Sequence, residues 1–402
     1  MKIDADKVYK LKGVIQNYAW GGAEFIPQLL GLSNEEHKPV AEYWMGTHSS
    51  APSELIENGN TIADLKQVLI EQKDLLGKKV IDRFNDLPYL LKILDVNDML
   101  SIQVHPTKAE AEKGYEEEEA RGIAINASTR NYKDKNHKPE VMIALSDFWL
   151  LHGFKPEAEL HKTLENIPEF ALLLSLFNRN NYRSLYSHVM EMQQEQVDAI
   201  LIPLIKRELE KRKYGKLQRN DAGWWVTEYY KEKELKDIDR GIFSIYFFNI
   251  VYLEKGQGIF QAAGIPHAYL QGQNVELMAN SDNVLRAGLT PKHIDVNELM
   301  KHTRFEPVHP IIMNGEQQGV YTNFYCPVDD FIITHLQLKS KESFSSQTQS
   351  AEIFICLEGS GSIKCSNNID IKRGEAFIIF ASNHYSIKAD NNMIIYKAGV
   401  PV

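Results

Sequence analysis

Residues 253–267, with the sequence LEKGQGIFQAAGIPH, follow the pattern of a short strand, a glycine turn and a second short strand. Residues 371–385, IKRGEAFIIFASNHY, repeat this pattern at a constant offset of 118 residues. The matched pairs are Leu253 with Ile371, Gly256 with Gly374, Phe260 with Ile378, Ala263 with Ala381 and His267 with Tyr385. An internal repeat of this kind predicts a mainly β fold with two duplicated barrels.

The rest of the chain divides around this repeat. Short apolar runs broken by Gly, Asn and Ser predict strands before Pro52, and further strands at Leu90–Leu94 and Leu100–His105. The helical period appears between about Pro156 and Lys236, and strands are expected again from Gly241. We therefore expect a first β domain of residues 1–155 plus 237–318, an α-helical insert of residues 156–236, and a C-terminal barrel of residues 319–402.

Composition limits the possible functions. The 402 residues carry a formal net charge of −9, which argues against a general nucleic-acid or anionic-membrane partner. No apolar run approaches the ~20 residues that cross a bilayer, and residues 1–7 lack an apolar signal segment, so a cytoplasmic protein is expected. Cys326, Cys356 and Cys365 lack the paired spacing of zinc or redox motifs, which predicts buried reduced thiols.

Three short segments contain potential metal ligands. Gln103 and His105 point the same way if residues 101–106 form a strand, because strand side chains alternate. Glu140 follows a proline and opens a buried-strand pattern, where a carboxylate needs either a metal or an ion pair with Lys or Arg. His267 follows a Gly and Pro turn. Alone, each segment has a plainer interpretation: a polar strand edge, an ion pair and a core histidine.

Together the segments provide one amide, two imidazoles and one carboxylate, a donor set that suits zinc better than magnesium or calcium. Iron and manganese are alternatives for the same set, and a closed structural zinc site is the alternative to a catalytic one. Structural zinc usually binds cysteine, and none of these four residues is a cysteine. In the C-terminal repeat, Tyr385 matches His267, although a slip of one residue brings His384 there. We expect that barrel to bind no metal.

These segments resemble signatures of the type I phosphomannose isomerases. The matching stretches are SIQVHP at 101–106, NHKPE at 136–140, PHAYL at 266–270 and NSDNVLRAGLTPK at 280–292, supported by QNYAWG at 16–21 and EYWMG at 42–46. The resemblance implies two cupin-type (jelly-roll) barrels with a helical insert and one zinc ion per chain, held by Gln103, His105, Glu140 and His267. It also implies conversion between mannose 6-phosphate and fructose 6-phosphate, with Arg286 as the catalytic arginine.

An aldose-ketose isomerisation through a cis-enediol needs a base beside carbon and positive charge beside oxygen. Lys138 and Arg286 are candidates for the charge. Possible proton carriers are Glu276, Asp282, His137 and Lys138, and Glu276 is the one whose strand pattern aims it inward.

Phosphate binding calls for cations, because no glycine-rich phosphate loop is present. Lys92, Lys138, Arg286 and Lys292 are available near the motifs, and Lys92 is equally well explained as a core lysine paired with a carboxylate. Ser101 either binds phosphate or orients Gln103.

Two other classes of protein compete with this hypothesis. One is a different cupin metalloenzyme, such as a glucose 6-phosphate isomerase or a dioxygenase, and the signature around Arg286 argues against it. The other is a sugar-phosphate-binding or regulatory cupin without catalysis, for which a DNA-binding segment or a basic surface is expected and neither is evident. We expect a monomer that acts on a small hexose phosphate.

Overall fold

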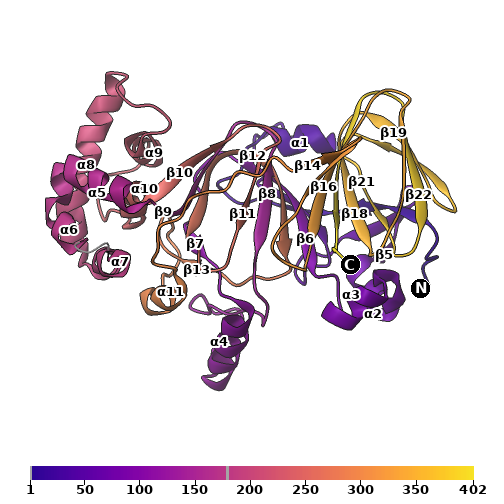
Figure 1. Cartoon of the computed structure of the whole chain (residues 1–402), viewed down its shortest axis with the longest axis horizontal. Helices are drawn as coiled ribbons and strands as arrows, with labels where there is room; N and C mark the ends of the chain where they lie inside the picture. The colour runs from indigo at the N-terminus through magenta and orange to yellow at the C-terminus, as the bar shows by residue number, and fades with distance from the viewer. Residues whose placement is uncertain (1, 178–180) are drawn as a thin grey trace.

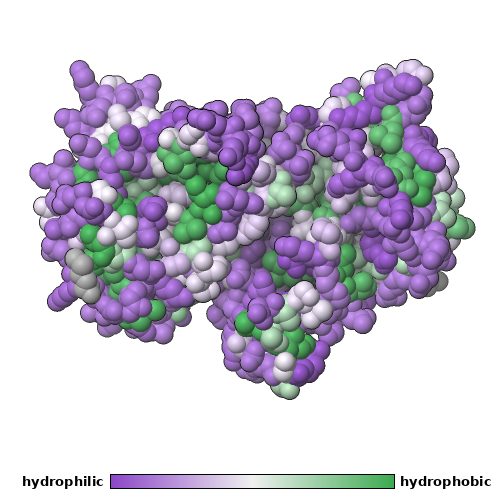
Figure 2. Space-filling view, turned by 180° about the vertical axis from the view of Figure 1, so that it is seen from behind, coloured by the Kyte–Doolittle hydropathy of each residue, from purple (hydrophilic) through white to green (hydrophobic). Residues whose placement is uncertain are grey.

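The computed structural model describes residues 2–177 and 181–402 and is mainly β. In Figure 1 a group of helices occupies one end of the molecule, the C-terminal strands occupy the other, and a large sheet lies between them. Within the described residues, every helix is too short or too polar to cross a bilayer. The face seen in Figure 2 is mostly hydrophilic, with apolar side chains in scattered patches.

The central sheet of the described residues has the strand order β10-β9-β12-β6-β3-β2, with β7, β8, β11 and β13 joined to it. Its longest strand, β12 (His267–Ala279), pairs with β6, β7, β8 and β9. The other strands are β2 (Val14–Gln16), β3 (Glu42–Gly46), β6 (Tyr89–Val96), β7 (Gln103–Val104), β8 (Glu140–Ala144), β9 (Phe148–Phe154), β10 (Phe248–Leu253), β11 (Gly258–Gln261) and β13 (Leu285–Arg286). Segments far apart in sequence thus meet along β12.

A second sheet of the described residues combines both ends of the chain, in the order β14-β15-β16-β23-β18-β21-β1-β4-β5, and a third has the order β17-β22-β19-β20. The strands are β1 (Val8–Lys12), β4 (Glu54–Glu57), β5 (Asn60–Asp64), β14 (Glu316–Gln318), β15 (Tyr321–Phe324), β16 (Ile332–Leu338), β17 (Ser343–Gln347), β18 (Glu352–Glu358), β19 (Ser360–Lys364), β20 (Asn368–Lys372), β21 (Ala376–Ile379), β22 (His384–Ala389) and β23 (Met393–Gly399). The N-terminal strands β1, β4 and β5 therefore complete the C-terminal sheet. The strands of residues 1–155, which we expected in the first β domain, are thus shared between two sheets.

The strands reproduce the repeat of the sequence. Both ends of β11 and β21 differ by the offset of 118 residues. Each strand pairs antiparallel with a buried neighbour, β11 with β8 and β21 with β18. Glu140 lies opposite Gln261 in the first pair, and Glu352 lies opposite Ile379 in the second. The two copies thus share pairing and register, while closure of either sheet into a barrel stays a prediction.

Helices form most of the segment between β9 and β10, two strands that pair with each other. The helices are α5 (Glu157–Asn166), η2 (Pro168–Phe170), α6 (Ala171–Leu176), α7 (Tyr182–Glu191), α8 (Gln194–Lys213), α9 (Ala222–Tyr229) and α10 (Gly241–Phe247). The expected return to strands at Gly241 is wrong, because Gly241–Phe247 is helical and buried at every position. An apolar run without alternation does not distinguish a buried helix from a buried strand.

The remaining helices lie at the edges of the sheets. They are α1 (Phe25–Leu30), α2 (Leu65–Glu71), η1 (Lys73–Leu76), α3 (Lys78–Phe84), α4 (Lys108–Ala120) and α11 (Val296–His302). Helix α2 is capped by the Asp64 side chain, which accepts a hydrogen bond from the Gln67 N–H, and Thr61 lies within β5. The cysteines are unpaired, and Cys356 is buried while Cys326 and Cys365 are partly exposed, so the prediction of three buried thiols is only partly confirmed.

Candidate metal centre and the cavity around it

Three strands of the central sheet bring His105, Glu140 and His267 together. His105 directly follows β7, Glu140 begins β8, and His267 begins β12. The ligand atoms of these buried side chains all lie within 4.8 Å of one another. Two imidazoles and one carboxylate form a donor set for one divalent metal ion.

Backbone carbonyl groups fix the orientation of both imidazoles. His105 Nδ1 donates to the oxygen of Asn283 at 2.9 Å, and His267 Nδ1 donates to the oxygen of Ile265 at 2.9 Å. A carbonyl oxygen only accepts, so each Nδ1 carries a proton and each Nε2 is the ring atom left to bind a metal. A hydrogen bond from the ring nitrogen that does not bind the metal is the usual support of a metal-binding histidine.

The Nε2 atoms of both rings face a carboxylate. Glu140 Oε1 lies 3.5 Å from His105 Nε2, and Glu140 Oε2 lies 3.4 Å from His267 Nε2. Both Nε2 atoms are buried, and neither has a hydrogen-bond partner among the described residues. Burial lowers the pKa of His105 well below its ordinary value, so this ring is neutral. A carboxylate and two buried ring nitrogens without hydrogen-bond partners lie close together, so the residues fit a metal ion.

Lys138 lies beside the cluster on the same extended segment as Glu140. Its Nζ is 2.7 Å from Glu140 Oε1. Burial raises the pKa of the Glu140 carboxyl, but Lys138, His105 and His267 outweigh burial and hold this pKa well below its ordinary value. Glu140 is therefore ionised, which is the form that binds a metal.

Gln103 and Arg286 lie next to the cluster in strand register. Gln103 is opposite His267 on one side and opposite Arg286 on the other. Both side chains line the cavity described below. The short strand β7 thus places a neutral amide between a ligand histidine and a cation, and the role of Gln103 as a fourth ligand stays a prediction.

A cavity of about 640 Å³ opens beside the cluster, a volume within the range of small-molecule sites. Ten of the predicted site residues line it, namely Lys92, Ser101, Gln103, Lys138, Glu140, His267, Glu276, Asp282, Arg286 and Lys292. His105 is fully buried against it. The structure therefore gathers residues that the sequence spreads over about 200 positions into one site.

Lys92 lies in this wall between two carboxylates. Its Nζ is 3.2 Å from Glu276 Oε2 and 3.4 Å from Glu42 Oε2, and it stands 4.8 Å from the ring centroid of Trp44. Burial lowers the pKa of Lys92, but Glu42 and Glu276 outweigh burial and raise it above the ordinary value. The ion pair that we considered for Lys92 is present, and the same side chain also lines the cavity.

Glu276 is the other half of this pair. Tyr269 donates its hydroxyl proton to Glu276 Oε1 at 2.8 Å, and Lys92 binds the other carboxylate oxygen. Burial raises the pKa of Glu276 above its ordinary value, although Lys92 opposes the shift. A buried carboxyl group with a raised pKa on a cavity wall is a candidate proton carrier.

His137 is not among the residues that line the cavity, and a role for it in substrate binding or proton transfer stays a prediction. His137 Nε2 lies 2.9 Å from Asp330 Oδ1. Pro139 keeps this segment extended, so side chains alternate and Lys138 and Glu140 face the site while His137 faces away.

Asp282 lines the cavity and pairs with a residue that the sequence analysis did not identify. Its Oδ2 lies 3.2 Å from Nε2 of the buried His48. Burial raises the pKa of Asp282, but His48, Lys133 and Lys138 outweigh burial and lower it. The ring of His48 lies edge-on to Trp44, with the ring centroids 4.7 Å apart.

One side of the cavity wall is cationic. Lys133, Lys233, Arg286 and Lys292 all line it, and none of their side chains forms an ion pair with a described residue. Burial is the main cause that lowers the pKa of Lys292, and the positive charges of Arg286 and Lys133 lower it further. Clustered cations that form no ion pair provide an anion-binding surface.

The helical segment contributes to this wall. Tyr229 at the end of α9 and Lys233 after it line the cavity, and Lys233 Nζ stands 3.1 Å from the ring centroid of Tyr229. Lys231 Nζ lies 3.8 Å from Oδ1 of Asp98, which lies between β6 and β7 of the central sheet. Of the residues that the sequence analysis missed, Trp44 and Glu42 belong to the stretch at 42–46, whereas Lys133 and Lys233 belong to no motif.

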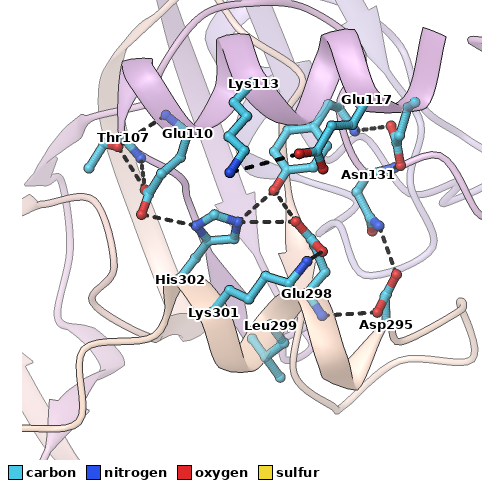
Figure 3. A network of polar contacts seen from close by, with 12 residues as sticks. Thr107, Glu110, Lys113, Glu117, Asn131, Asp295, Glu298, Leu299, Lys301 and His302 are labelled. Carbon is cyan, nitrogen blue, oxygen red and sulfur yellow. Dashed lines mark hydrogen bonds and ion pairs between the residues drawn. The ribbon is translucent and has the colours of Figure 1, made fainter. Parts of the chain in front are cut away.

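A polar network supports the loop that leads to Lys138. His302 at the end of α11 contacts Glu110 of α4, Glu298 and the Tyr132 hydroxyl (Figure 3). Tyr132 immediately precedes Lys133, whose backbone N–H donates to Asn283 Oδ1 at 2.7 Å. The network thus ties α4 and α11 to the segment that carries two cavity lysines.

The chain is similar to known proteins over most of its length. The model "phosphomannose isomerase type I, catalytic domain" matches residues 8–157, and "mannose-6-phosphate isomerase, cupin domain" matches residues 321–396. The mannose-6-phosphate isomerase of Escherichia coli (strain K12) is 38% identical over 381 residues, which cover 93% of this chain and 95% of that protein. The chain belongs to the type I phosphomannose isomerase family.

Members of this family from distant organisms match over the whole length. The Homo sapiens mannose-6-phosphate isomerase is 33% identical, with 98% of this chain and 99% of that protein covered. The structure of the Salmonella typhimurium phosphomannose isomerase bound to fructose 6-phosphate and zinc has a TM-score of 0.85 at 33% identity and covers 98% of this chain and 100% of that one. The predicted family, and a cupin domain in a mainly β structure, are confirmed.

Proposed function

We propose that this chain interconverts D-mannose 6-phosphate and D-fructose 6-phosphate with one bound zinc ion. The observation that carries the proposal is a buried metal-ligand cluster that opens into a cavity with four unpaired cations on one wall. The cluster suits a reaction at sugar oxygens, and the cationic wall suits a phosphate group. Relatives named mannose-6-phosphate isomerase, and a neighbour with fructose 6-phosphate and zinc, support this substrate.

We propose His105, Glu140 and His267 as zinc ligands, with Gln103 as the fourth. When bound, zinc supplies Lewis-acid stabilisation for negative charge on the sugar oxygens. The neutral His105 and the ionised Glu140 have the protonation states that this role requires. The single carboxylate among the ligands leaves the centre with net positive charge.

Proton transfer through a cis-enediol is assigned to Glu276. The reaction takes a proton from C2 of the aldose and returns it to C1 of the ketose, so one group that accepts and donates suffices. Glu276 lines the cavity, and its raised pKa brings it closer to neutral pH. Tyr269 and Lys92 fix both of its oxygens. Lys138 and Arg286 supply positive charge beside the sugar oxygens, and Arg286 stays protonated throughout.

The phosphate is assigned to the cationic wall. Arg286 and Lys292 lie there as the sequence analysis expected, and Lys133 and Lys233 join them. Arginine binds phosphate in a bidentate manner and lysine binds it as a point charge. Ser101 and Asp282 line the same cavity and are assigned to hydroxyl groups of the sugar.

The proposal includes a division of the chain into three parts. Residues 1–155 and 237–318 form the catalytic cupin domain and residues 156–236 form a helical insert. Residues 319–402 form a second cupin-like barrel without metal, to which β1, β4 and β5 add strands. The one group of metal-binding residues found in the described chain lies in the first part, which supports this assignment. A cytoplasmic monomer stays a prediction from the sequence.

The test is conversion of mannose 6-phosphate to fructose 6-phosphate by the native, the chelator-treated and the zinc-restored protein. We expect turnover in the first and third samples and its loss in the second, with metal content verified by mass spectrometry. Full turnover after verified metal removal would overturn the metal-dependent mechanism. Binding of fructose 6-phosphate without turnover in any sample would favour a sugar-phosphate-binding cupin.

Arg286→Gln tests the active site separately. We expect kcat/KM to fall about 100-fold, because the variant loses a cation next to the developing charge. Lys135→Gln is the control, since Lys135 pairs with Glu116 outside the cavity. Equal kcat/KM in both variants would remove Arg286 from the mechanism.

A further inference from the structure

A second cavity, of about 550 Å³, lies away from the metal centre. None of the residues that line it lines the cavity beside the cluster. It lies where α1, the turn after β8 and the β10–β11 turn meet the C-terminal strands β16, β18 and β23. The two repeats of the chain therefore share its walls, and no step of the proposed reaction uses it.

The floor of this cavity is apolar and partly aromatic. Leu29, Leu357 and Tyr396 are buried there. The ring of His335 lies against Tyr396, with centroids 4.9 Å apart and planes 33° apart. Burial, followed by the charge of Lys255, lowers the pKa of His335, so the ring is neutral. Such a floor suits a flat apolar body.

The mouth carries two cations from equivalent turns of the repeat. Lys255 precedes Gly256 and Arg373 precedes Gly374, and the offset between these turns is the 118 residues of the repeat. Gly374 has φ +85°, and a Cβ there would lie 2.0 Å from the backbone oxygen of Leu29. The turn that carries Arg373 is therefore held tightly against α1.

The charges at the mouth do not cancel. Lys255 Nζ lies 3.2 Å from Glu358 Oε1. Arg373 forms no side-chain hydrogen bond or ion pair with any residue in the described part of the chain. Two cations and one carboxylate leave one positive charge, although the whole chain has a net charge of −9. A local positive charge above an apolar floor selects for a small anion with an apolar body.

We propose that this cavity is a second ligand site that binds a small amphipathic monoanion, such as an aromatic carboxylate or sulfonate. The flat body lies on Tyr396, His335 and Leu29, and the anionic group lies between Arg373 and Lys255. The volume of the cavity matches that of a drug-sized ligand site. The site is independent of the proposed isomerase reaction.

The probe is 1-anilinonaphthalene-8-sulfonate, which has an aromatic body and one sulfonate. We titrate it into the full-length, zinc-loaded protein by calorimetry and expect one site per chain with a Kd on the order of 10 µM. Saturating fructose 6-phosphate should leave this binding unchanged. Displacement by fructose 6-phosphate would place the probe in the first cavity and overturn the proposal.

Two variants locate the site. Arg373→Glu should weaken binding at least about 10-fold by reversing one charge, and Ile394→Trp should abolish it by filling the cavity. Lys372→Glu is the matched control, because Lys372 is exposed, adjacent to Arg373 and outside the cavity. Unfolding curves confirm that each variant is folded. Equal affinity in all three variants, or binding to several unsaturable sites, would overturn the proposal.

Discussion

The two copies of the repeat place different chemistry at equivalent positions. Glu140 in β8 corresponds to Glu352 in β18, because their partners Gln261 and Ile379 are related by the offset of 118 residues. Both carboxylates are buried. Glu140 faces two histidines, whereas Glu352 Oε1 accepts a hydrogen bond from Lys397 Nζ at 3.1 Å. A lysine thus compensates the charge in the second copy where a metal ion is proposed in the first.

The side chains around these two carboxylates also differ between the copies. His267 corresponds to Tyr385, which is buried in an apolar cluster with Phe354 and Phe377. The rings of Phe354 and Phe377 are stacked, with centroids 4.5 Å apart. The first copy uses the interior of its sheet for an open cavity, and the second fills it with side chains. One scaffold therefore supports either a site or a packed core, depending on a few inward-facing residues.

The largest effect is expected from removing a ligand of the first copy. His267→Ala should abolish stoichiometric zinc binding and reduce kcat about 1000-fold, because the centre loses one of three tightly clustered ligands. The matched change in the second copy, Tyr385→Phe, should leave both quantities unchanged. Zinc content by mass spectrometry and isomerase turnover are the measurements. Full zinc occupancy in His267→Ala would show that His267 is not a zinc ligand.

The ion pair of the second copy should matter for stability and not for turnover. Lys397→Met leaves Glu352 buried without its partner, which should lower the free energy of unfolding by about 3 kcal/mol. The double variant Lys397→Met with Glu352→Gln should recover much of this loss, because no unpaired charge remains. Urea unfolding and kcat are measured on both variants. A fall in kcat with unchanged stability would contradict the structural role of this pair.

The helix network beside the first copy should make stability depend on pH. His302 contacts Glu110 and Glu298 (Figure 3), and these contacts outweigh burial and raise its pKa above the ordinary value of 6.5. The stabilisation is therefore complete below pH 6.5 and is lost as pH rises through the raised pKa. The contact of His302 lowers the pKa of Glu298 to about 2, so Glu298 stays ionised over this range.

His302→Gln removes this dependence. The variant should be less stable than the parent by about 1 to 3 kcal/mol near pH 6, and the difference should shrink at alkaline pH. The measurement is the free energy of urea unfolding at several pH values. A difference that grows as pH rises would show that the charged form of His302 is not the stabilising one.

The sequence predicted the features that rest on local rules. Side-chain alternation in the extended segment around Pro139 puts Lys138 and Glu140 on one face, and both line the cavity. The repeat matches the bounds of β11 and β21. Alternation also turns His137 away from Glu140, and His137 contacts Asp330. The ligand histidines could be proposed because their segments contain recognisable turns and family signatures.

Other features depend on which distant segments meet. The register of β3, β6 and β12 places Glu42 and Glu276 on either side of Lys92, and no local pattern fixes that register. Lys233 reaches the cavity because the helical segment folds back over it. Helix α10 was mistaken for a strand because it is buried on all sides and has no alternation to reveal its period.

The smallest expected effect exchanges one residue between the two copies. Gln261 is fully buried beside Glu140, and neither its Nε2 nor its Oε1 has a hydrogen-bond partner among the described residues, whereas the equivalent Ile379 is apolar. Gln261→Ile should therefore raise the free energy of unfolding by about 1 kcal/mol, because a buried amide without partners costs its desolvation energy. The reverse change, Ile379→Gln, should lower stability by at least as much. Urea unfolding of the metal-free proteins isolates this effect from zinc binding. A destabilised Gln261→Ile would mean that the amide forms hydrogen bonds after all and helps to hold Glu140 in place.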